Sequence, residues 1–150
     1  MRNRLGSSPY TARSMAFAIK IEVRDPKKKT FAFTVQKTMY GGKYIAEGDE
    51  VFVFASENEG GRDPIARGMV TSAEVLARTR GIARQTPRVS NMVRRTGLAE
   101  RPLGRSELKH LTEWGDRRPQ TELNFKFYRH ATNKIIGISE EAALFLRGFF

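Results

Sequence analysis

Apolar side chains recur at every second position in several short segments of this chain, and no other feature of the sequence limits the fold so strongly. In residues 17–23 the apolar positions are Phe17, Ile19, Ile21 and Val23, and the residues between them are small or charged. This period of two is typical of a β-strand with one face buried and the other exposed. The first element after residue 15 is therefore predicted to be a half-buried strand.

Similar segments follow along the chain and predict about six or seven short strands. The predicted strands are residues 17–23, 30–36, 50–54, 65–75, 89–98, 121–129 and 134–138. A turn at Asp25-Pro26 and the lysines after it lie between the first two, so these strands are expected to form a hairpin. Residues 73–84 are rich in Ala, Leu and Arg and leave helix and strand both open at that point.

Two short helices are predicted late in the chain, at residues 107–111 and 140–147. Ser139 is expected to cap the second helix, because a serine hydroxyl satisfies a free amide at a helix start. Ala143, Leu144 and Leu146 are expected to face inward. The pattern indicates an α+β fold, a small β-barrel or curled sheet with helical plugs, and it argues against a doubly wound dinucleotide-binding fold because no β-α-β alternation is present.

The segment Glu50–Phe54 differs from the other predicted strands because both of its faces are apolar. Val51 and Val53 point to one side, and Phe52 and Phe54 point to the other. A strand that is buried on both faces lies inside a sheet or under a second layer. This strand is therefore expected to be central.

Residue types that are rare or absent exclude several kinds of chemistry. The chain has no cysteine and two histidines, so disulfides, thiolate zinc sites and a cysteine nucleophile are excluded, and we expect no metal and no cofactor. His110 and His130 have no serine or acid at a spacing that suggests a triad. No apolar run approaches the roughly 20 residues that a membrane helix requires. A soluble, cytoplasmic protein without a membrane partner is expected.

The net charge of +11 is unevenly distributed. Residues 1–44 carry ten basic and two acidic side chains, residues 45–74 two basic and seven acidic, and residues 75–150 fifteen basic and seven acidic. Between Arg78 and Arg105 the basic residues are all arginines, and Glu100 is the one acid. Arginine pairs phosphate oxygens two at a time and stacks on bases. This stretch indicates a polyanion-binding surface, with an ordinary solvated face as the alternative.

Residues 1–14 are small, basic and free of acidic side chains and of hydrophobic periodicity. They are expected to be a flexible basic tail, with Met15 as an alternative start and residues 15–150 as a single domain.

Aromatic residues next to basic side chains are a second indication of nucleic-acid binding, because nucleobases stack on aromatic rings. Tyr40 and Tyr44 flank Lys43 around the pair Gly41-Gly42, although a structural turn is the favoured interpretation of that pair.

Four groups of residues together resemble the EVE domain family of the PUA-like superfamily. The segment 47–54 resembles its Gly-Asp turn and strand, and residues 65–75 resemble the next strand, which ends in Ala-Glu-Val. Residues 93–109 are similar to a strand that runs through a proline turn into a helix. Residues 127–130 and 138–141 resemble the last strand, its arginine and the final helix cap. The likeness covers about residues 44–147, and it implies a small mixed PUA-like barrel in which residues 73–75 are strand.

The resemblance implies a module that binds RNA or DNA and holds a flipped or modified base in a barrel pocket. The residues expected in that pocket are Tyr40, Lys43, Ser56, Asn58 and Arg129. The residues expected to contact phosphates are Arg94, Arg95, Arg101 and Arg105. The Trp-Asp and Arg-Asn-Tyr segments of EVE domains have no counterpart here, so their residues are not carried over.

Two other functions stay open at this stage. One is an ASCH-like hydrolase of a modified nucleoside, in which Lys43 and Glu57 would converge on a threonine or water. The other is a protein-interaction module that uses the acidic residues 47–63. A binding domain is favoured over an enzyme, because no spacing of reactive side chains identifies a catalytic site.

Overall fold

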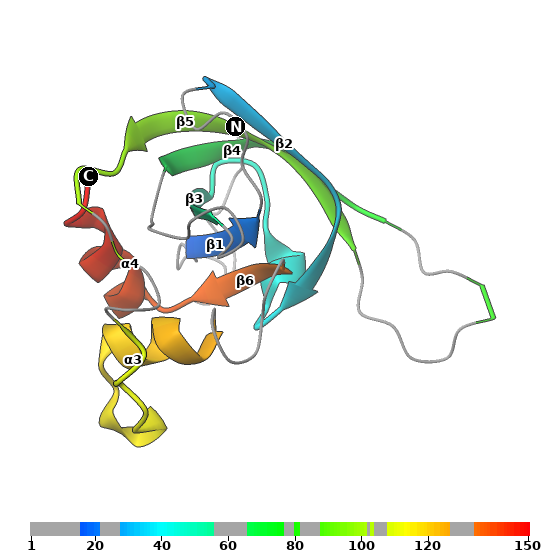
Figure 1. Ribbon diagram of the computed structural model, residues 1–150. Helices are drawn as coiled ribbons and strands as arrows, with labels where there is room; N and C mark the ends of the chain where they lie inside the picture. Colours follow the sequence, from blue (N-terminus) through cyan, green and yellow to red (C-terminus); the bar gives the residue numbers. More distant parts are fainter. Residues whose placement is uncertain are drawn as a thin grey trace, which may run out of the picture.

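The computed structural model describes residues 16–21, 28–55, 66–76, 80–81, 88–101, 103, 108–126 and 134–150. Figure 1 shows a small barrel with helices at one side. Its elements are β1 (Ala16–Ile21), β2 (Thr30–Met39), η1 (Gly42–Tyr44), β3 (Glu50–Ala55), β4 (Ala66–Val75), β5 (Val89–Leu98), η3 (Trp114–Asp116), α3 (Pro119–Asn124), β6 (Lys134–Ile138) and α4 (Glu140–Arg147). The predicted tail, residues 1–14, lies outside the described residues.

The strands close into a barrel in the order β1-β3-β4-β5-β2-β6. β1 pairs with β3 and β2 pairs with β6 in parallel, whereas β6 closes the barrel against β1 in the antiparallel sense. The remaining pairs, β3 with β4, β4 with β5 and β5 with β2, are antiparallel. Closure leaves no unpaired sheet edge. The predicted α+β fold, a small mixed barrel with short helices, is confirmed.

The predicted hairpin between the first two strands is wrong, although both strands form. β1 pairs with β3 and β6, and β2 pairs with β5 and β6, so β6 lies between the first two strands. Alternation identifies a strand and its buried face, but it carries no information about the neighbour. Closing the barrel decides this pairing.

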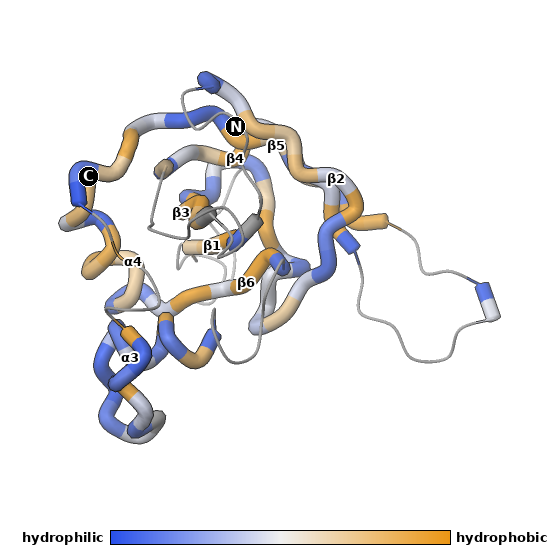
Figure 2. The backbone as a smooth tube through the Cα atoms, in the orientation of Figure 1, coloured by the Kyte–Doolittle hydropathy of each residue, from blue (hydrophilic) through white to orange (hydrophobic). Residues whose placement is uncertain are grey.

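Two apolar clusters hold the barrel together, one inside it and one between its wall and the helices. Val51 and Val53 of β3 belong to the inner cluster with Phe17, and Phe52 and Phe54 belong to the outer cluster with residues of α4. All four β3 side chains are fully buried. The prediction of a central strand with two apolar faces is therefore confirmed. Figure 2 shows apolar residues on β6 and α4, on the side where the helices lie.

The predicted strand at residues 121–129 is wrong over its described part, because residues 119–124 form the helix α3. Pro119 occupies the first turn, where its fixed backbone angle favours a helix. Glu122 and Lys126 form an ion pair four residues apart, an arrangement that brings side chains together on a helix. The alternation of Leu123 and Phe125 was mistaken for a strand pattern.

The final helix starts as predicted, since the Ser139 side chain accepts a hydrogen bond from the Ala142 amide. Ala143 and Leu146 are buried, but Leu144 is 67% exposed, so its predicted inward position is wrong.

Among the helices that the structure describes, none has both the length and the apolar character of a membrane-spanning segment. Residues 73–75 are strand within β4, as the resemblance implied.

Candidate functional site

A cavity of about 510 Å³ and a larger one of about 890 Å³ lie on the molecule. The larger one, which we call the Tyr40 cavity, is bounded by the end of β2, the segment around η3, α3 and the junction of β6 with α4. Its volume is in the range of about 300–1,000 Å³ that is usual for small-molecule sites. It is therefore large enough for a ligand the size of a nucleotide base.

Backbone geometry at the end of β2 places Tyr40 in this cavity. Tyr40 and Gly41 both have positive φ angles, 53° and 81°, and the Tyr40 carbonyl accepts a hydrogen bond of 3.1 Å from the Gly137 amide. Gly42 packs so closely against β6 that an added Cβ would lie 2.0 Å from the Ile135 carbonyl oxygen. The glycine pair thus makes a tight structural turn, which was the favoured interpretation of this motif.

One ring face of Tyr40 lies against a cation. The Lys126 Nζ is 4.8 Å from the ring centre, and it donates hydrogen bonds to Glu122 Oε2 at 3.1 Å and to the Gly137 carbonyl at 2.9 Å. Glu122 also accepts hydrogen bonds from the backbone amide and the hydroxyl of Ser139. Burial raises the pKa of Tyr40 above its usual value. The contact with Lys126 positions the ring, and burial favours the neutral phenol.

The exposed side chains that line the cavity include two arginines and the carboxylate of Glu141. Arg117 and Arg118 line it and are exposed. Asp116 accepts hydrogen bonds from the Arg118 amide and from the Thr121 hydroxyl, each at 2.9 Å, and its carboxylate is 3.6 Å from the Arg118 Nε. The hydrogen bond that the Arg118 backbone amide donates is the main reason why the pKa of Asp116 is lowered. An ionised Asp116 therefore positions the turn that presents the two guanidinium groups.

The structure brings one predicted pocket residue to the cavity and leaves another outside it. Tyr40 lines the cavity. Lys43 does not; it is exposed, and its Nζ lies 5.1 Å from the centre of the Tyr44 ring. Ser56, Asn58 and Arg129 lie outside the described residues, as does Glu57 of the hydrolase alternative.

The predicted phosphate-contacting arginines do not line the Tyr40 cavity. Arg94 and Arg95 lie on β5, which β2 separates from β6 in the barrel. The Arg101 Nη2 donates to the Gly148 carbonyl at 2.7 Å, and its guanidinium lies 4.5 Å from the centre of the Phe149 ring. Arg105 lies outside the described residues. Phosphate contact by these side chains stays a prediction.

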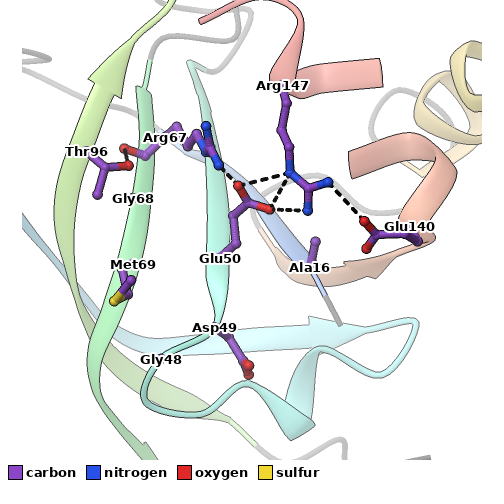
Figure 3. A pocket seen from close by; sticks show the side chains of 10 residues that line it. All are labelled: Ala16, Gly48, Asp49, Glu50, Arg67, Gly68, Met69, Thr96, Glu140 and Arg147. Atoms are coloured by element: carbon purple, nitrogen blue, oxygen red, sulfur yellow. Dashed lines mark hydrogen bonds and ion pairs between the residues drawn. The ribbon is translucent and has the colours of Figure 1, made fainter. Parts of the chain in front are cut away.

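The smaller cavity contains an ion-pair network centred on Glu50, drawn in Figure 3. Glu50 accepts from the Arg67 Nε at 2.5 Å and from the Arg147 Nη2 at 2.7 Å. The Arg147 Nη1 also donates to Glu140 at 2.9 Å. These hydrogen bonds, the one to Glu50 above all, raise the pKa of Arg147. The network joins α4 to β3 and β4.

Sequence reasoning did not assign Arg117, Arg118, Glu122 or Lys126 to a site. The first two follow Trp114 closely, and Lys126 precedes Phe127 and Tyr128, so they carried the signal of bases beside aromatic residues. The ion pair of Glu122 with Lys126 becomes visible only when this segment is treated as a helix. The strand prediction for residues 121–129 concealed it.

The closed mixed barrel, with helices packed outside β1, β3 and β6, is the fold that the EVE-like, PUA-like resemblance predicted. Comparisons with solved structures agree. The DUF55 domain of human thymocyte nuclear protein 1 is similar with a TM-score of 0.60 at 14% identity, over 89% of this chain and 96% of that one. A hypothetical protein from Leishmania major gives 0.59 at 18% identity, over 91% and 95%.

A third similar structure is human THYN1 protein in complex with DNA that contains 5-methylcytosine. Its TM-score is 0.52 at 14% identity, over 90% of this chain and 96% of that one. No family model matches the chain, and no curated protein matches it. At these identities the similarity establishes the fold, and the predicted EVE-like, PUA-like resemblance is confirmed at that level.

Proposed function

We propose that this protein is a nucleic-acid-binding module that takes one unpaired or extruded base, in particular a modified one, into the Tyr40 cavity. The observation that carries the proposal is the partly buried Tyr40 ring in a cavity of about 890 Å³ whose rim bears two exposed arginines. A protein with the same fold has been solved in complex with DNA that contains 5-methylcytosine, which supports nucleic acid as the ligand.

Stacking is the physical basis of the base contact. Lys126 lies over one face of the Tyr40 ring, and the base would stack on the part of the ring that lines the cavity. Such stacking contributes about 1–3 kcal/mol per base and accepts any base, since every base has a π-face. Discrimination of a modified base therefore comes from the fit of the cavity around it and from the hydrogen-bonding groups of Glu122 and Glu141 on its wall.

Phosphate contacts are the second part of the proposal. Arg117 and Arg118 lie at the rim, where their guanidinium groups would pair with the phosphates on either side of the extruded nucleotide. Such contacts position the strand and give salt-dependent affinity without sequence preference. The cavity would then supply the recognition, and the rim would supply most of the binding free energy.

Fluorescence anisotropy with single-stranded DNA and RNA oligonucleotides, each with and without one 5-methylcytosine, tests this function. We expect Tyr40→Ala to weaken binding about 5- to 150-fold, the equivalent of about 1–3 kcal/mol. The matched control is Tyr44→Ala, which removes a 65% exposed tyrosine outside the cavity and should leave affinity unchanged. Equal affinities of the wild type and Tyr40→Ala would contradict the proposal.

A hydrolase is the second candidate function, and one observation favours it. Lys126, Glu122 and Ser139 converge in the Tyr40 cavity, where the hydroxyl of Ser139 donates to Glu122. A lysine, a carboxylate and a hydroxyl are the groups that an ASCH-like hydrolase requires. Here Lys126 and Glu122 would take the roles that were predicted for Lys43 and Glu57. In that mechanism Glu122 would take the Ser139 proton as Oγ adds to an amide carbon, and the Lys126 ammonium would stabilise the oxyanion. Glu122 would then give the proton to the departing amine as the C–N bond breaks, and water would hydrolyse the ester left on Ser139.

Chromatographic assay of an amide-bearing nucleoside separates the two functions. A hydrolase at this site would consume the nucleoside at a rate abolished by Lys126→Gln and unchanged by Lys43→Ala. Loss of the rate in Lys43→Ala alone would instead favour the pair predicted from sequence. No consumption by the wild type would leave the binding function as the one supported.

A further inference from the structure

The outer face of β4 and β5 carries exposed basic and apolar side chains that lie outside the Tyr40 cavity. Along β4, Arg67 is half-buried and Met69 is 41% exposed, while the residues between and beside them are buried. Arg94 on β5 is exposed and lies opposite Met69 in the strand register. Arg67, Met69 and Arg94 therefore share one face of the barrel wall.

Two lysines are held beside this face by β5. The backbone amide of Arg95 donates to the Lys29 carbonyl at 2.7 Å, and the Arg95 Nε donates to the Lys28 carbonyl at 2.9 Å. Both lysines are exposed. These two hydrogen bonds use the backbone carbonyls of the lysines and do not engage their ammonium groups. We call Lys28, Lys29, Arg67, Arg94 and Arg95 the β4–β5 basic surface.

Arg67 is fixed at the end of this surface next to the smaller cavity. Its Nε is bound to Glu50, and its carbonyl accepts a hydrogen bond of 3.2 Å from the Thr96 hydroxyl. Glu50 is shared with Arg147, which also binds Glu140, so the two guanidinium groups and the two carboxylates of this network balance. Figure 3 shows Arg67 and Arg147 on opposite sides of the Glu50 carboxylate. The positive charge of the surface therefore comes from its other members, Lys28, Lys29, Arg94 and Arg95.

The helix α4 lies between this surface and the Tyr40 cavity. Glu140 at its first turn lines the smaller cavity, and the next residue, Glu141, lines the Tyr40 cavity. Both carboxylates are exposed. A phosphodiester strand that followed α4 from the Tyr40 cavity toward β4 would pass the exposed carboxylate of Glu141, which repels it, and then Glu140, which is paired with Arg147. A strand held at one site is thus not led to the other.

We propose that the β4–β5 basic surface is a second phosphate-binding site that ignores base identity, and that the protein holds two polynucleotide segments at once. The second statement rests on the proposed function, which supplies the segment in the Tyr40 cavity. The first does not, because it follows from the charge and exposure of this face alone. Exposed Met69 adds an apolar contact beside Arg94 for the sugar or base edges.

A bridging assay tests the proposal with the full chain. A biotinylated oligo-dT is immobilised, the protein is added, and the amount of a second, fluorescent oligo-dT that is captured is measured. Two oligo-dT strands cannot base-pair, so capture requires that the protein bind both. We expect capture by the wild type and loss of capture by Lys29→Gln/Arg94→Gln, which retains binding to a single strand. The matched control is Lys37→Gln/Lys134→Gln, a cross-strand pair on β2 and β6 with the same change of charge.

Salt titration of single-strand affinity gives a second readout. Loss of two phosphate contacts lowers the slope of log K against log salt by about 1.4 for single strands. For Lys29→Gln/Arg94→Gln we expect this smaller salt slope and an unchanged preference for a modified base. In Tyr40→Ala we expect the reverse, an unchanged slope and a lost preference, so failure of either site is recognised separately.

Three outcomes would overturn the second site. The first is that Lys29→Gln/Arg94→Gln captures as much oligo-dT as the control variant. The second is that the wild type sediments as a dimer under the assay conditions and bridges only in that state. The third is that anionic phospholipid vesicles, and not oligo-dT, depend on Lys29 and Arg94, which would make the face a lipid-binding surface.

Discussion

The barrel has two walls that differ in what covers them. On β1, β3 and β6 the inner side chains such as Phe17 pack in the barrel, and the outer ones such as Phe52 pack under α3 and α4. On β4 and β5 the inner side chains are equally buried, but Met69 and Met92 on the outside are 41% and 39% exposed. The covered wall (β1, β3 and β6) therefore contributes apolar packing on both of its faces. The open wall (β4 and β5) packs on its inner face and carries the β4–β5 basic surface on its outer face.

The difference between the two walls also explains where the two cavities lie. Each one flanks α4, the helix that covers the first wall and ends where the second begins. The Tyr40 cavity is built from the covering elements, and the smaller cavity lies at the seam, where Glu50 of β3 binds Arg67 of β4 and Arg147 of α4. The following substitutions test the difference between the walls.

The largest effect is expected at the covered wall. Phe52→Ala removes a fully buried ring that packs under the helices, and it should lower the free energy of unfolding by about 3–5 kcal/mol. Met92→Ala on the open wall should change it by about 0.5 kcal/mol or less. Urea denaturation followed by circular dichroism measures both. Similar losses at the two positions would show that the open wall is also covered.

Gly42→Ala tests the crowding on the β6 side. A Cβ there would lie 2.0 Å from the Ile135 carbonyl oxygen, so backbone must shift, at a cost of about 1–3 kcal/mol. Gly115→Ala is the control, since no atom lies within 4 Å of its Cβ position. We also expect Gly42→Ala to weaken oligonucleotide binding more than its effect on stability explains, because the turn positions Tyr40. Unchanged stability would show that the turn adapts.

Glu50→Gln tests the seam between the two walls. The neutral amide leaves two guanidinium groups facing each other, and we expect a loss of about 1–2 kcal/mol measured by thermal unfolding. Glu140→Gln removes a carboxylate whose side chain is 60% exposed and that binds Arg147, so about 0.5 kcal/mol or less is expected. If both variants lose the same amount, Glu50 does not join the walls.

The smallest effect is expected at Asp116, on the rim of the Tyr40 cavity. Its pKa is lowered in the folded state, mainly by the hydrogen bond from the Arg118 amide. The stabilisation is therefore present above the ordinary carboxyl pKa and is lost as the pH falls through the lowered value. Asp116→Asn should remove this acid-side dependence of the melting temperature. An identical pH profile in the variant would exclude the contribution.

Sequence patterns predicted those parts of the fold that depend on which side chains are buried. The two apolar faces of residues 50–54 indicated a central strand, and Ser139 indicated the start of α4; both are confirmed. The helix α3 was missed because Leu123 and Phe125 alternate, and Pro119 at its first turn outweighed that alternation. The hairpin was wrong because pairing depends on β6, which is more than 100 residues away from β1.

The sequence by itself determined that this is a basic chain of short strands with a central apolar strand and a glycine turn after Tyr40. Local periodicity and residue chemistry suffice for that. Only the tertiary structure decided that Lys126 lies over the Tyr40 ring and that Arg117 and Arg118 line the same cavity. It also decided that Arg94 lies on the barrel wall formed by β4 and β5, outside that cavity. These groupings depend on how the barrel closes, and closure depends on contacts between residues that are far apart in the chain.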